Sequence, residues 1–449
     1  MNSIPNNNHF KQLWLLAWPL ILTQIGHIIT GMVDTYFLGK VGVTEQASGI
    51  LANNLFMLVL VFGIGMSYAT TPLVANAHEM NNIEEKASYF KNSVLLNIIC
   101  SIFLFAILFF LSPLLNHMNQ PEDVVTLATP YYHVINFSLI PVSIFFVCKQ
   151  YCEGVSNTKA ALIISIIGNL INIPLNYALI YGKFGLPELG YMGTAWATLI
   201  SRIIMAIGFL LLMYKMAPIN EIFSETIMAK INFPHFKRLL KIGLSSAMQF
   251  SFEVAAFVIA GLMSGSFGKE QLDAHGIALH LAAFTYMFAS GISGAATIRT
   301  GMFKAKNNWH EINQTVIASI KMIFLFMGIA AIGFLLTKSY LPTIFSDDES
   351  IIELTSRLLI IAALFQLFDG LQVTIIGVLR GLEDIKIPTA VTLIGYWIVA
   401  LGMCYFLAFH LQIGVIGVWI GLLIGLVFVA VSLLWRYVIL YRDNRPDEA

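Results

Sequence analysis

Three acidic side chains, Asp34, Glu253 and Asp369, stand inside long apolar stretches of the sequence. An ionised residue at the centre of a bilayer costs roughly 2.5–3.5 kcal/mol even on a lenient insertion scale, so intramembrane acids are functional candidates by default. A carboxylate that is removed from water resists ionisation and accepts a proton or a bound cation as its partner. The chemistry predicted for these three residues is therefore reversible binding of small cations.

Each acid has polar neighbours at helical spacing, and such stripes face the protein interior rather than lipid. These neighbours are Thr23, His27 and Thr30 for Asp34, Gln249 for Glu253, and Gln366 and Gln372 for Asp369. A separate stripe contains Asn169, Asn172 and Asn176, and Pro174 among them frees a backbone carbonyl. Carboxylate, amide and hydroxyl oxygens suit a small hard cation.

The alternative interpretation of the three acids is a structural ion pair. The only strong basic candidate for such a pair is Arg202, which also falls inside an apolar stretch. One arginine cannot neutralise three acids, so the sequence favours a cation-binding role.

The composition requires a membrane to surround these residues. Hydrophobic residues make up 58% of the 449 residues and charged residues only 11%, whereas soluble domains carry about 25% charged residues. A spanning helix needs about 20 mostly apolar residues, and this criterion predicts an all-α polytopic membrane protein with twelve transmembrane helices. The predicted spans are 12–37, 51–76, 92–115, 129–152, 161–181, 191–214, 238–264, 274–298, 315–337, 354–379, 389–410 and 414–438.

The positive charges predict the orientation, because Lys and Arg near helix ends are retained in the cytoplasm. With the N-terminus inside, 18 of the 25 Lys and Arg residues fall in cytoplasmic segments, five fall outside, and Arg202 and Lys321 fall within spans. Both termini are therefore expected in the cytoplasm.

Short segments of the first half of the chain recur in the second half at an offset of 226 or 227 residues. The matches are residues 9–13 with 235–239, 47–50 with 274–277, 154–159 with 381–386, and Gly168 with Gly395. Each copy contains six spans, an even number, so the repeat is parallel rather than inverted. We expect a six-helix N-lobe at residues 1–218, a cytoplasmic linker at 219–236 and a six-helix C-lobe at 237–449. Two such lobes are typical of an alternating-access transporter.

The opening span carries a recognisable pattern: Pro19 and Gln24 precede a motif over residues 31–39, Gly-Met-Val-Asp-Thr-Tyr-Phe-Leu-Gly. The pattern resembles the signature of the multidrug and toxic compound extrusion (MATE) family, NorM-like branch, in the MOP superfamily. The resemblance implies a twelve-helix antiporter that exports organic cations in exchange for Na⁺ or H⁺. Within it, Glu253, Asp369 and Tyr286 match the residues of a cation site.

The resemblance also implies a second cation site in the N-lobe, at Asp34, Asn172, Asn176 and Thr194. The DinF-like branch has an Asp where this chain has Asn176, and this difference lowers the negative charge of the lobe. The amide and hydroxyl oxygens coordinate Na⁺ without titrating, so Na⁺ is favoured over H⁺, although both can serve in one cycle.

Other functions fit the sequence less well. A lipid-linked oligosaccharide flippase of the MOP type would need several Arg or Lys in its cavity, and a receptor or passive channel would not need a twofold repeat with asymmetric acids. No Walker motif is present, and the net charge of zero offers no face for nucleic acid. We therefore expect no enzyme activity and no cofactor beyond the coupling ions. The expected protein is a monomer in a bacterial inner membrane, with organic cations and the lipid bilayer as its partners.

Overall fold

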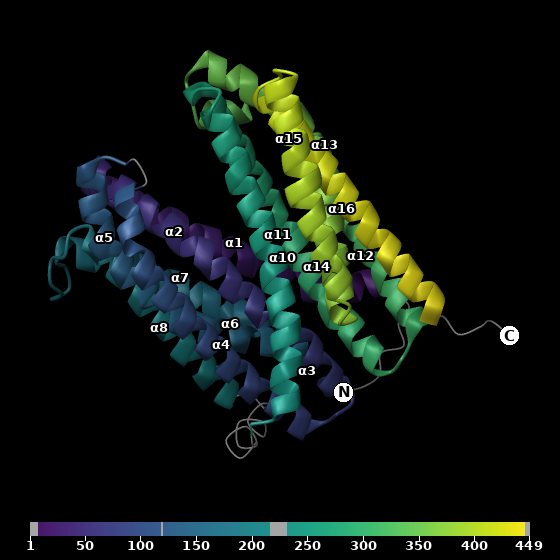
Figure 1. Ribbon diagram of the computed structural model, residues 1–449. Helices are drawn as coiled ribbons and strands as arrows, with labels where there is room; N and C mark the ends of the chain where they lie inside the picture. The colour runs from purple at the N-terminus through teal and green to yellow at the C-terminus, as the bar shows by residue number, and fades with distance from the viewer. Residues whose placement is uncertain (1–7, 118–119, 216–230, 445–449) are drawn as a thin grey trace. The chain divides into compact units, whose positions relative to one another are not determined.

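The computed structural model describes residues 8–117, 120–215 and 231–444, and all regular elements within these ranges are helical. The helices of the first half are α1 (His9–Val41), α2 (Val43–Ser67), α3 (Thr70–Glu79), α4 (Ile83–Leu111), α5 (Glu122–Asn136), α6 (Leu139–Gly154), α7 (Thr158–Tyr181) and α8 (Met192–Lys215). Those of the second half are α10 (Phe233–Gly265), α11 (Lys269–Ala305), α12 (Trp309–Thr337), α13 (Glu349–Gly381), α14 (Lys386–Leu393), α15 (Leu401–Tyr405) and α16 (Val415–Asn444). Figure 1 shows their course.

The helices confirm the predicted membrane fold. Within the described ranges, eleven helical segments are long and apolar enough to cross a bilayer, or twelve if the bent pair α5 and α6 is one span. Helices α2 and α3 form one of these segments, and another runs from Lys386 to His410 through two π-helical turns, at Ile394–Ala400 and Phe406–His410. Ten of the twelve predicted spans fall within one of these segments, counting the bent pair as one, and the spans 191–214 and 414–438 each begin one residue before theirs.

Prolines explain why two spans of the first half are interrupted. Pro72 stands in the first turn of α3 and Pro141 in the first turn of α6, and neither can donate a hydrogen bond to the preceding turn. The chain breaks just before each proline, and α5 and α6 meet at an angle of 44°. The equivalent positions of the second copy are Ile298 and Phe368, and there α11 and α13 continue without a break.

The repeat predicted from the sequence is visible in the backbone of the connecting turns. Asn81 and Asn307 both have left-handed conformations, with φ of 52° and 51°, and Ser156 and Glu383 follow with 63° and 59°. After the first pair of turns, Asn82 and Asn308 each cap the next helix by accepting a hydrogen bond from a backbone N–H. Equivalent turns therefore adopt equivalent conformations in both halves.

Two compact units make up the chain, and each contains parts of both sequence copies. One, the N-terminal unit, comprises Leu22–Ala247, and the other, the C-terminal unit, comprises residues up to Ile21 and from Met248 onward. The divisions therefore fall within α1 and α10, not at the predicted boundaries of 218 and 237. Most of the predicted linker, residues 219–230, lies outside the described residues, and α10 already begins at Phe233. The lobes assigned from the sequence stay a prediction.

Close helix packing accounts for this division. The ring of Trp14 in α1 stacks on Phe326 of α12, with centroids 5.3 Å apart. The ring of His235 in α10 stacks on Tyr89 of α4 at 4.4 Å. The first part of α1 is thus held by helices of the second half of the chain, and the first part of α10 by helices of the first half.

The core of the C-terminal unit is organised around α13, which packs against α11, α12 and α16 (Figure 1). Its glycines allow close approach, because the hydroxyl of Thr297 in α11 donates a hydrogen bond to the backbone oxygen of Gly377 at 2.8 Å. In the N-terminal unit the equivalent residue, Thr71 of α3, donates to the backbone oxygen of Gln150 in α6 at 3.1 Å. Both copies therefore use the same interhelical hydrogen bond.

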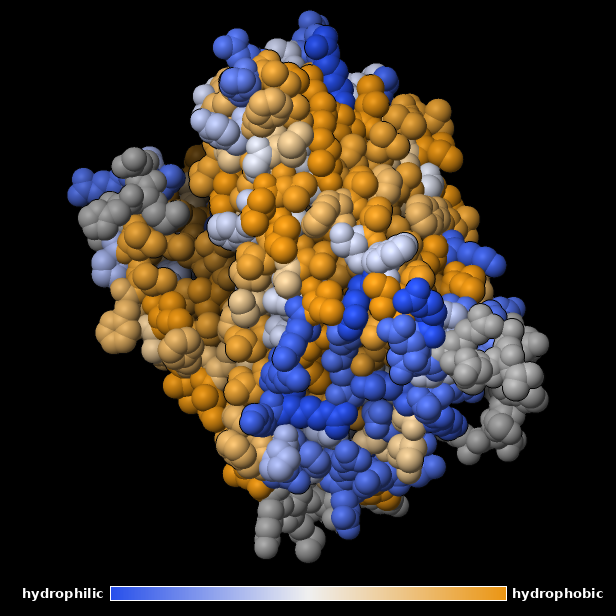
Figure 2. Space-filling view, turned by 45° about the vertical axis from the view of Figure 1, so that its right-hand side comes forward, coloured by the Kyte–Doolittle hydropathy of each residue, from blue (hydrophilic) through white to orange (hydrophobic). Residues whose placement is uncertain are grey.

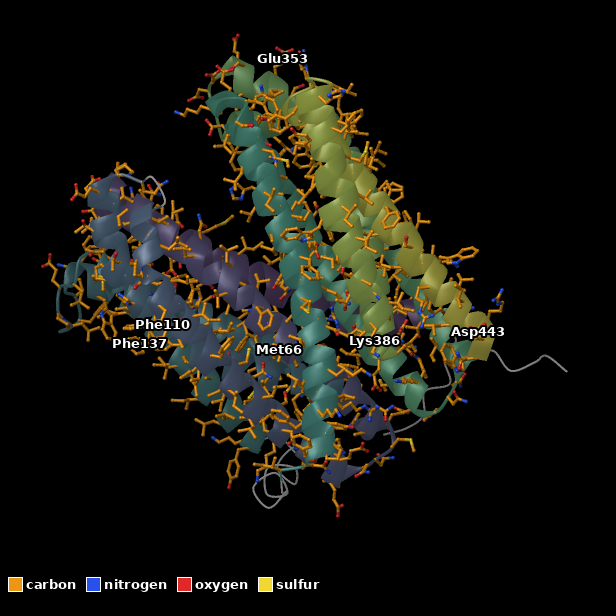
Figure 3. The ribbon with its side chains drawn as sticks, viewed as in Figure 1. Met66, Phe110, Phe137, Glu353, Lys386 and Asp443 are labelled. Atoms are coloured by element: carbon orange, nitrogen blue, oxygen red, sulfur yellow. The ribbon has the colours of Figure 1, made fainter. Side chains whose placement is uncertain are left out.

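The face in view in Figure 2 is largely apolar, shown in orange, with a large group of polar side chains over its lower part and a smaller one at its top. Large side chains such as Phe110 and Leu336 are 79% and 80% exposed, as expected of residues that face lipid. In Figure 3, Glu353 marks one end of the C-terminal unit, and Lys386 and Asp443 lie toward the other.

Candidate functional sites

The carboxylate of Asp34 is buried within the N-terminal unit, where α1, α7 and α8 meet. Its Oδ1 accepts a hydrogen bond from the side-chain amide of Asn176 in α7 at 2.9 Å. Its Oδ2 accepts one from the hydroxyl of Thr198 in α8 at 2.6 Å. Asn172 lies beside the same carboxylate, and its Oδ1 accepts a hydrogen bond from Asn176 at 3.1 Å. We call Asp34, Asn172, Asn176, Thr194 and Thr198 the N-terminal pocket.

Helical spacing explains how α7 and α8 bring these groups together. Asn172 and Asn176 are four residues apart, as are Thr194 and Thr198, so each pair lies on one face of its helix. Among the described residues, the Oδ1 atom of Asn176 and the hydroxyl of Thr194 are buried without a hydrogen-bond partner. The pocket thus combines one carboxylate with neutral oxygen atoms that can still accept a donor or a cation.

The structure brings Asp34, Asn172 and Asn176 together and adds Thr198, which the sequence did not single out. Thr194 is buried on α8, one helical turn before Thr198. The sequence could have indicated Thr198, because this residue follows Thr194 by one helical turn and so lies on the same face of α8. The third asparagine of the predicted stripe, Asn169 of α7, contacts another part of α1, where its amide donates to the backbone oxygen of Gly26 at 2.9 Å. Its Oδ1 accepts a short hydrogen bond from Thr30.

A second pair of buried carboxylates lies in the C-terminal unit. Glu253 of α10 and Asp369 of α13 are 7% and 5% exposed and lie close enough to interact electrostatically. Glu253 lies beside Tyr396 and Gln372, and the Tyr396 hydroxyl donates a hydrogen bond to Oε1 of Gln372 at 2.6 Å. Tyr286 of α11 lies near Tyr396. We call these five residues the C-terminal pocket.

Tyr396 was not expected from the sequence, and its place follows from an irregular backbone. It lies in the π-helical turn Ile394–Ala400, and such turns are frequent at functional sites because they redirect side chains. Within the described part of the chain, Oδ1 of Asp369 is buried without a hydrogen-bond partner. Like the N-terminal pocket, this pocket retains an unused oxygen.

The other polar neighbours of the acids serve packing between helices. The amide of Gln249 donates to the hydroxyl of Thr389 at 3.0 Å, and that of Gln366 donates to the backbone oxygen of Met327 at 3.5 Å. His27 lies between the rings of Phe145 and Phe146, with centroids 5.9 and 5.8 Å away. Gln372, which was expected beside Asp369, lies next to Glu253 in the C-terminal pocket.

The acidic loop at Asp347 and Asp348 has a local structural role. The side chain of Asp348 caps α13, accepting hydrogen bonds from the hydroxyl and the backbone N–H of Ser350 at 2.7 and 2.9 Å. These hydrogen bonds, chiefly the one from the Ser350 hydroxyl, hold the pKa of the Asp348 carboxyl below its usual value.

Oxygen atoms dominate the polar side chains of both pockets. Over the ranges that the structure describes, no three or more His, Cys, Asp or Glu side chains come together. A cation in either pocket would therefore be held by one or two carboxylates, with amide, hydroxyl and backbone oxygens completing its shell. Such oxygen ligands are those of hard cations.

The fold, with its twofold repeat and buried carboxylates inside membrane helices, defines a polytopic membrane transporter. Residues 19–178 and 245–406 match the family model described as MatE. The chain therefore belongs to the MatE family, whose named members are multidrug transporters and not enzymes.

Curated relatives are similar over nearly their whole length. The chain is 30% identical to the probable multidrug resistance protein NorM of Agrobacterium fabrum, covering 97% of this chain and 95% of the relative. It is 33% identical to the NorM protein of Rhodopseudomonas palustris, with 96% and 92% coverage. It is 30% identical to the multidrug resistance protein MdtK of Photorhabdus laumondii, with 98% and 96% coverage. These matches support multidrug efflux as the activity of this chain.

Solved structures share the fold. The eukaryotic MATE transporter AtDTX14 superposes with a TM-score of 0.87 at 18% identity, covering 98% of each chain. A MOP superfamily transporter from Pyrococcus furiosus superposes with a TM-score of 0.88 at 17% identity, covering 99% of this chain and 100% of the other. At this level of identity the likeness concerns the fold.

Proposed function

We propose that this protein is a secondary-active antiporter that exports organic cations in exchange for Na⁺ or H⁺ by alternating access. The single observation that carries the proposal is that all three intramembrane acids are buried beside unused oxygen atoms. A carboxylate kept in such a place at an energetic cost is expected to be neutralised by a cation during part of the cycle.

The paired carboxylates of the C-terminal pocket also determine the sign of the substrate. A cationic drug can be stabilised by Glu253 or Asp369 when the coupling ion has left, whereas an anion would be repelled. Aromatic side chains such as Tyr286 and Tyr396 add faces that attract a positively charged group. Competition between the drug and the coupling ion for one set of carboxylates makes their binding mutually exclusive, and this exclusion produces exchange.

Sodium is the coupling ion that the ligands favour. A proton needs only the carboxylate, whereas the oxygens of Asn172 and Asn176 beside Asp34, with the hydroxyl of Thr194 on the same face of α8 as Thr198, would supply the several ligands that a metal cation requires. Sodium and protons can both serve in one cycle, because a carboxylate in apolar surroundings binds either.

The protein is proposed to work as a monomer in the inner membrane of a bacterium, with both termini in the cytoplasm. The bias of Lys and Arg supports this orientation. In the C-terminal unit, Lys386 and Asp443 lie toward the end opposite Glu353 (Figure 3), as required if residues near 386 and 443 are cytoplasmic and those near 353 are external.

The decisive experiment is drug counterflow in proteoliposomes with an imposed gradient of one ion at a time. At fixed and symmetric pH, an inward Na⁺ gradient should drive efflux of a preloaded fluorescent organic cation, in the direction opposite to Na⁺. If a pH gradient drives exchange and a Na⁺ gradient does not, the coupling ion is H⁺ and the sodium assignment is wrong. If neither gradient drives exchange, the antiport proposal fails.

A further inference from the structure

Arg202 is the one arginine that lies midway along a membrane-spanning helix in the described N-terminal unit, and the cation-binding proposal leaves it without a role. It lies in α8, one turn after Thr198, whose hydroxyl donates to Oδ2 of Asp34. Since residues four apart share a helix face, the arginine stem points toward the same side of α8 as Thr198. Its charge lies near enough to Asp34 to interact with it electrostatically.

The guanidinium is nevertheless held to one side of the carboxylate. Its Nη1 donates to the hydroxyl of Ser138 at 2.5 Å, in the bend between α5 and α6. Its Cζ lies 4.8 Å from the centroid of the Phe56 ring in α2, a cation–π contact. Asp34 instead accepts its hydrogen bonds from the neutral groups of Asn176 and Thr198. The arginine is thus close enough to act on Asp34 through its field and tethered away from direct pairing.

We propose that Arg202 is a positioning residue that supplies a fixed internal counter-charge to the N-terminal pocket and keeps the affinity of Asp34 for its cation low enough for release. This inference rests on the proposed role of Asp34 in binding the coupling ion. With Arg202 present, the empty pocket is close to neutral, and an incoming cation adds a net positive charge inside the membrane. Without it, the empty pocket would be negative and would hold a cation more tightly.

The hydrogen bond to Ser138 and the cation–π contact with Phe56 determine how strongly Arg202 lowers the cation affinity of Asp34. Held by Ser138 and Phe56, the guanidinium leaves both oxygens of Asp34 open to neutral ligands. If the Ser138 tether is removed, the guanidinium can swing toward Asp34 and compete with the cation directly. The inference therefore predicts that loss of the charge and loss of the tether shift cation affinity in opposite directions.

The test uses the full chain with the C-terminal pocket silenced by Glu253→Gln and Asp369→Asn. In this background, the thermal unfolding midpoint of the purified protein is measured against NaCl, with choline chloride holding ionic strength constant. Arg202→Gln should lower the half-saturating Na⁺ concentration about tenfold or more, and Ser138→Ala should raise it. Arg202→Lys keeps the charge but loses the planar group that stacks on Phe56, so its half-saturating Na⁺ concentration should stay at or above the background value.

Two further variants separate the inference from the proposed function. Lys321→Gln removes an exposed charge from α12 and should leave the Na⁺ response unchanged. Adding Asp34→Asn to Arg202→Gln should abolish the gain in affinity. If Arg202→Gln leaves the half-saturating concentration unchanged while Asp34→Asn abolishes the response, the counter-charge inference is overturned and the pocket stands. If Asp34→Asn leaves the response intact, the pocket assignment itself falls, and the inference falls with it.

Discussion

Gly65 of α2 lies against the backbone of Ala247 in α10, so that a Cβ atom added to Gly65 would lie 2.4 Å from the Cα of Ala247. The repeat places an equivalent contact 226 residues later, where a Cβ on Gly291 of α11 would lie 2.8 Å from the backbone N of Ile21 in α1. Ala247 and Ile21 are the residues at which α10 and α1 pass from one compact unit to the other. In both copies a glycine therefore allows the close helix contact at this point: Gly65 between α2 and α10, and Gly291 between α11 and α1.

The first prediction concerns the close contact between α2 and α10 at Gly65. Gly65→Ala should force α2 and α10 apart, because the obstacle is rigid backbone and not a flexible side chain. Overpacking of this kind costs about 1–3 kcal/mol. We expect a lower thermal unfolding midpoint and reduced drug transport in proteoliposomes.

Gly63→Ala is the matched control on the same helix. A Cβ there would meet only Cδ1 of Leu104 at 3.5 Å, an ordinary contact. A Gly65→Ala protein as stable and active as the Gly63→Ala protein would contradict the close packing described for α2 and α10.

The second prediction concerns Thr198, whose hydroxyl donates to Asp34. Thr198→Val keeps the shape of the side chain and removes the donor. A hydrogen bond to a charged group contributes about 1.5–3 kcal/mol. We therefore expect the ion concentration for half-maximal transport to change by about tenfold or more.

Thr337→Val is the control for this substitution, because the Thr337 hydroxyl donates to the backbone oxygen of Gly333 in its own helix, at 2.6 Å. Ion dependence should be unchanged in this variant. Equal ion dependence of the Thr198→Val and wild-type proteins would remove Thr198 from the N-terminal pocket.

Hydrophobic length and the offset of 226 residues were sufficient to predict the helices and their repeat, because both depend on local composition. The breaks before Pro72 and Pro141 were not predicted, although proline in a helix is a visible signal. A bilayer tolerates prolines in spanning helices, so the sequence did not indicate whether these would bend or interrupt a span.

The sequence predicted the acidic residues of the two pockets but not their uncharged members Thr198 and Tyr396. Asp34, Glu253 and Asp369 stood out because charge is rare in a span. Thr198 and Tyr396 did not, because hydroxyl and aromatic side chains are common in membrane helices, and their roles depend on the packing of α8 and on a π-helical turn. Tertiary contacts, and not local sequence, select such residues.

The third prediction concerns the two acids of the C-terminal pocket. Glu253→Gln and Asp369→Asn should each reduce coupled drug export to the background level while the protein remains folded in the membrane, because the neutral amide removes the negative charge that attracts the cation. The measurement is drug resistance of cells at matched expression. Glu353→Gln is the control on α13, since this side chain is 69% exposed and should be dispensable. Resistance at the wild-type level in either pocket variant would defeat the assignment.

The fourth prediction separates the acidic loop from the pockets. The pKa of the Asp348 carboxyl is lower in the folded protein than in the unfolded chain. The ionised carboxylate therefore stabilises the fold fully at pH values above the Asp348 pKa of the unfolded chain, and this stabilisation is lost as the pH falls through the Asp348 pKa of the folded protein. Asp348→Ala should increase hydrogen exchange at the start of α13 near neutral pH, whereas Asp348→Asn, which can still cap the helix, should do so less. Neither change should alter drug export. An altered drug profile in the Asp348→Asn protein would indicate contact with substrate instead.

The last prediction concerns Tyr396, which connects the π-helical turn to Gln372 beside Glu253. Tyr396→Phe removes a hydroxyl that donates to Gln372 at 2.6 Å and leaves the ring in place. A buried acceptor left without its donor costs about 1–3 kcal/mol, and Gln372 would then be free to turn toward Glu253 and compete with the cation. We expect the half-maximal coupling-ion concentration in proteoliposomes to rise severalfold, with little change in expression. Tyr405→Phe, at a ring that is 62% exposed in α15, is the control and should transport normally. If both variants show the same ion dependence as the wild type, Tyr396 serves packing alone and the C-terminal pocket is limited to its carboxylates and their other neighbours.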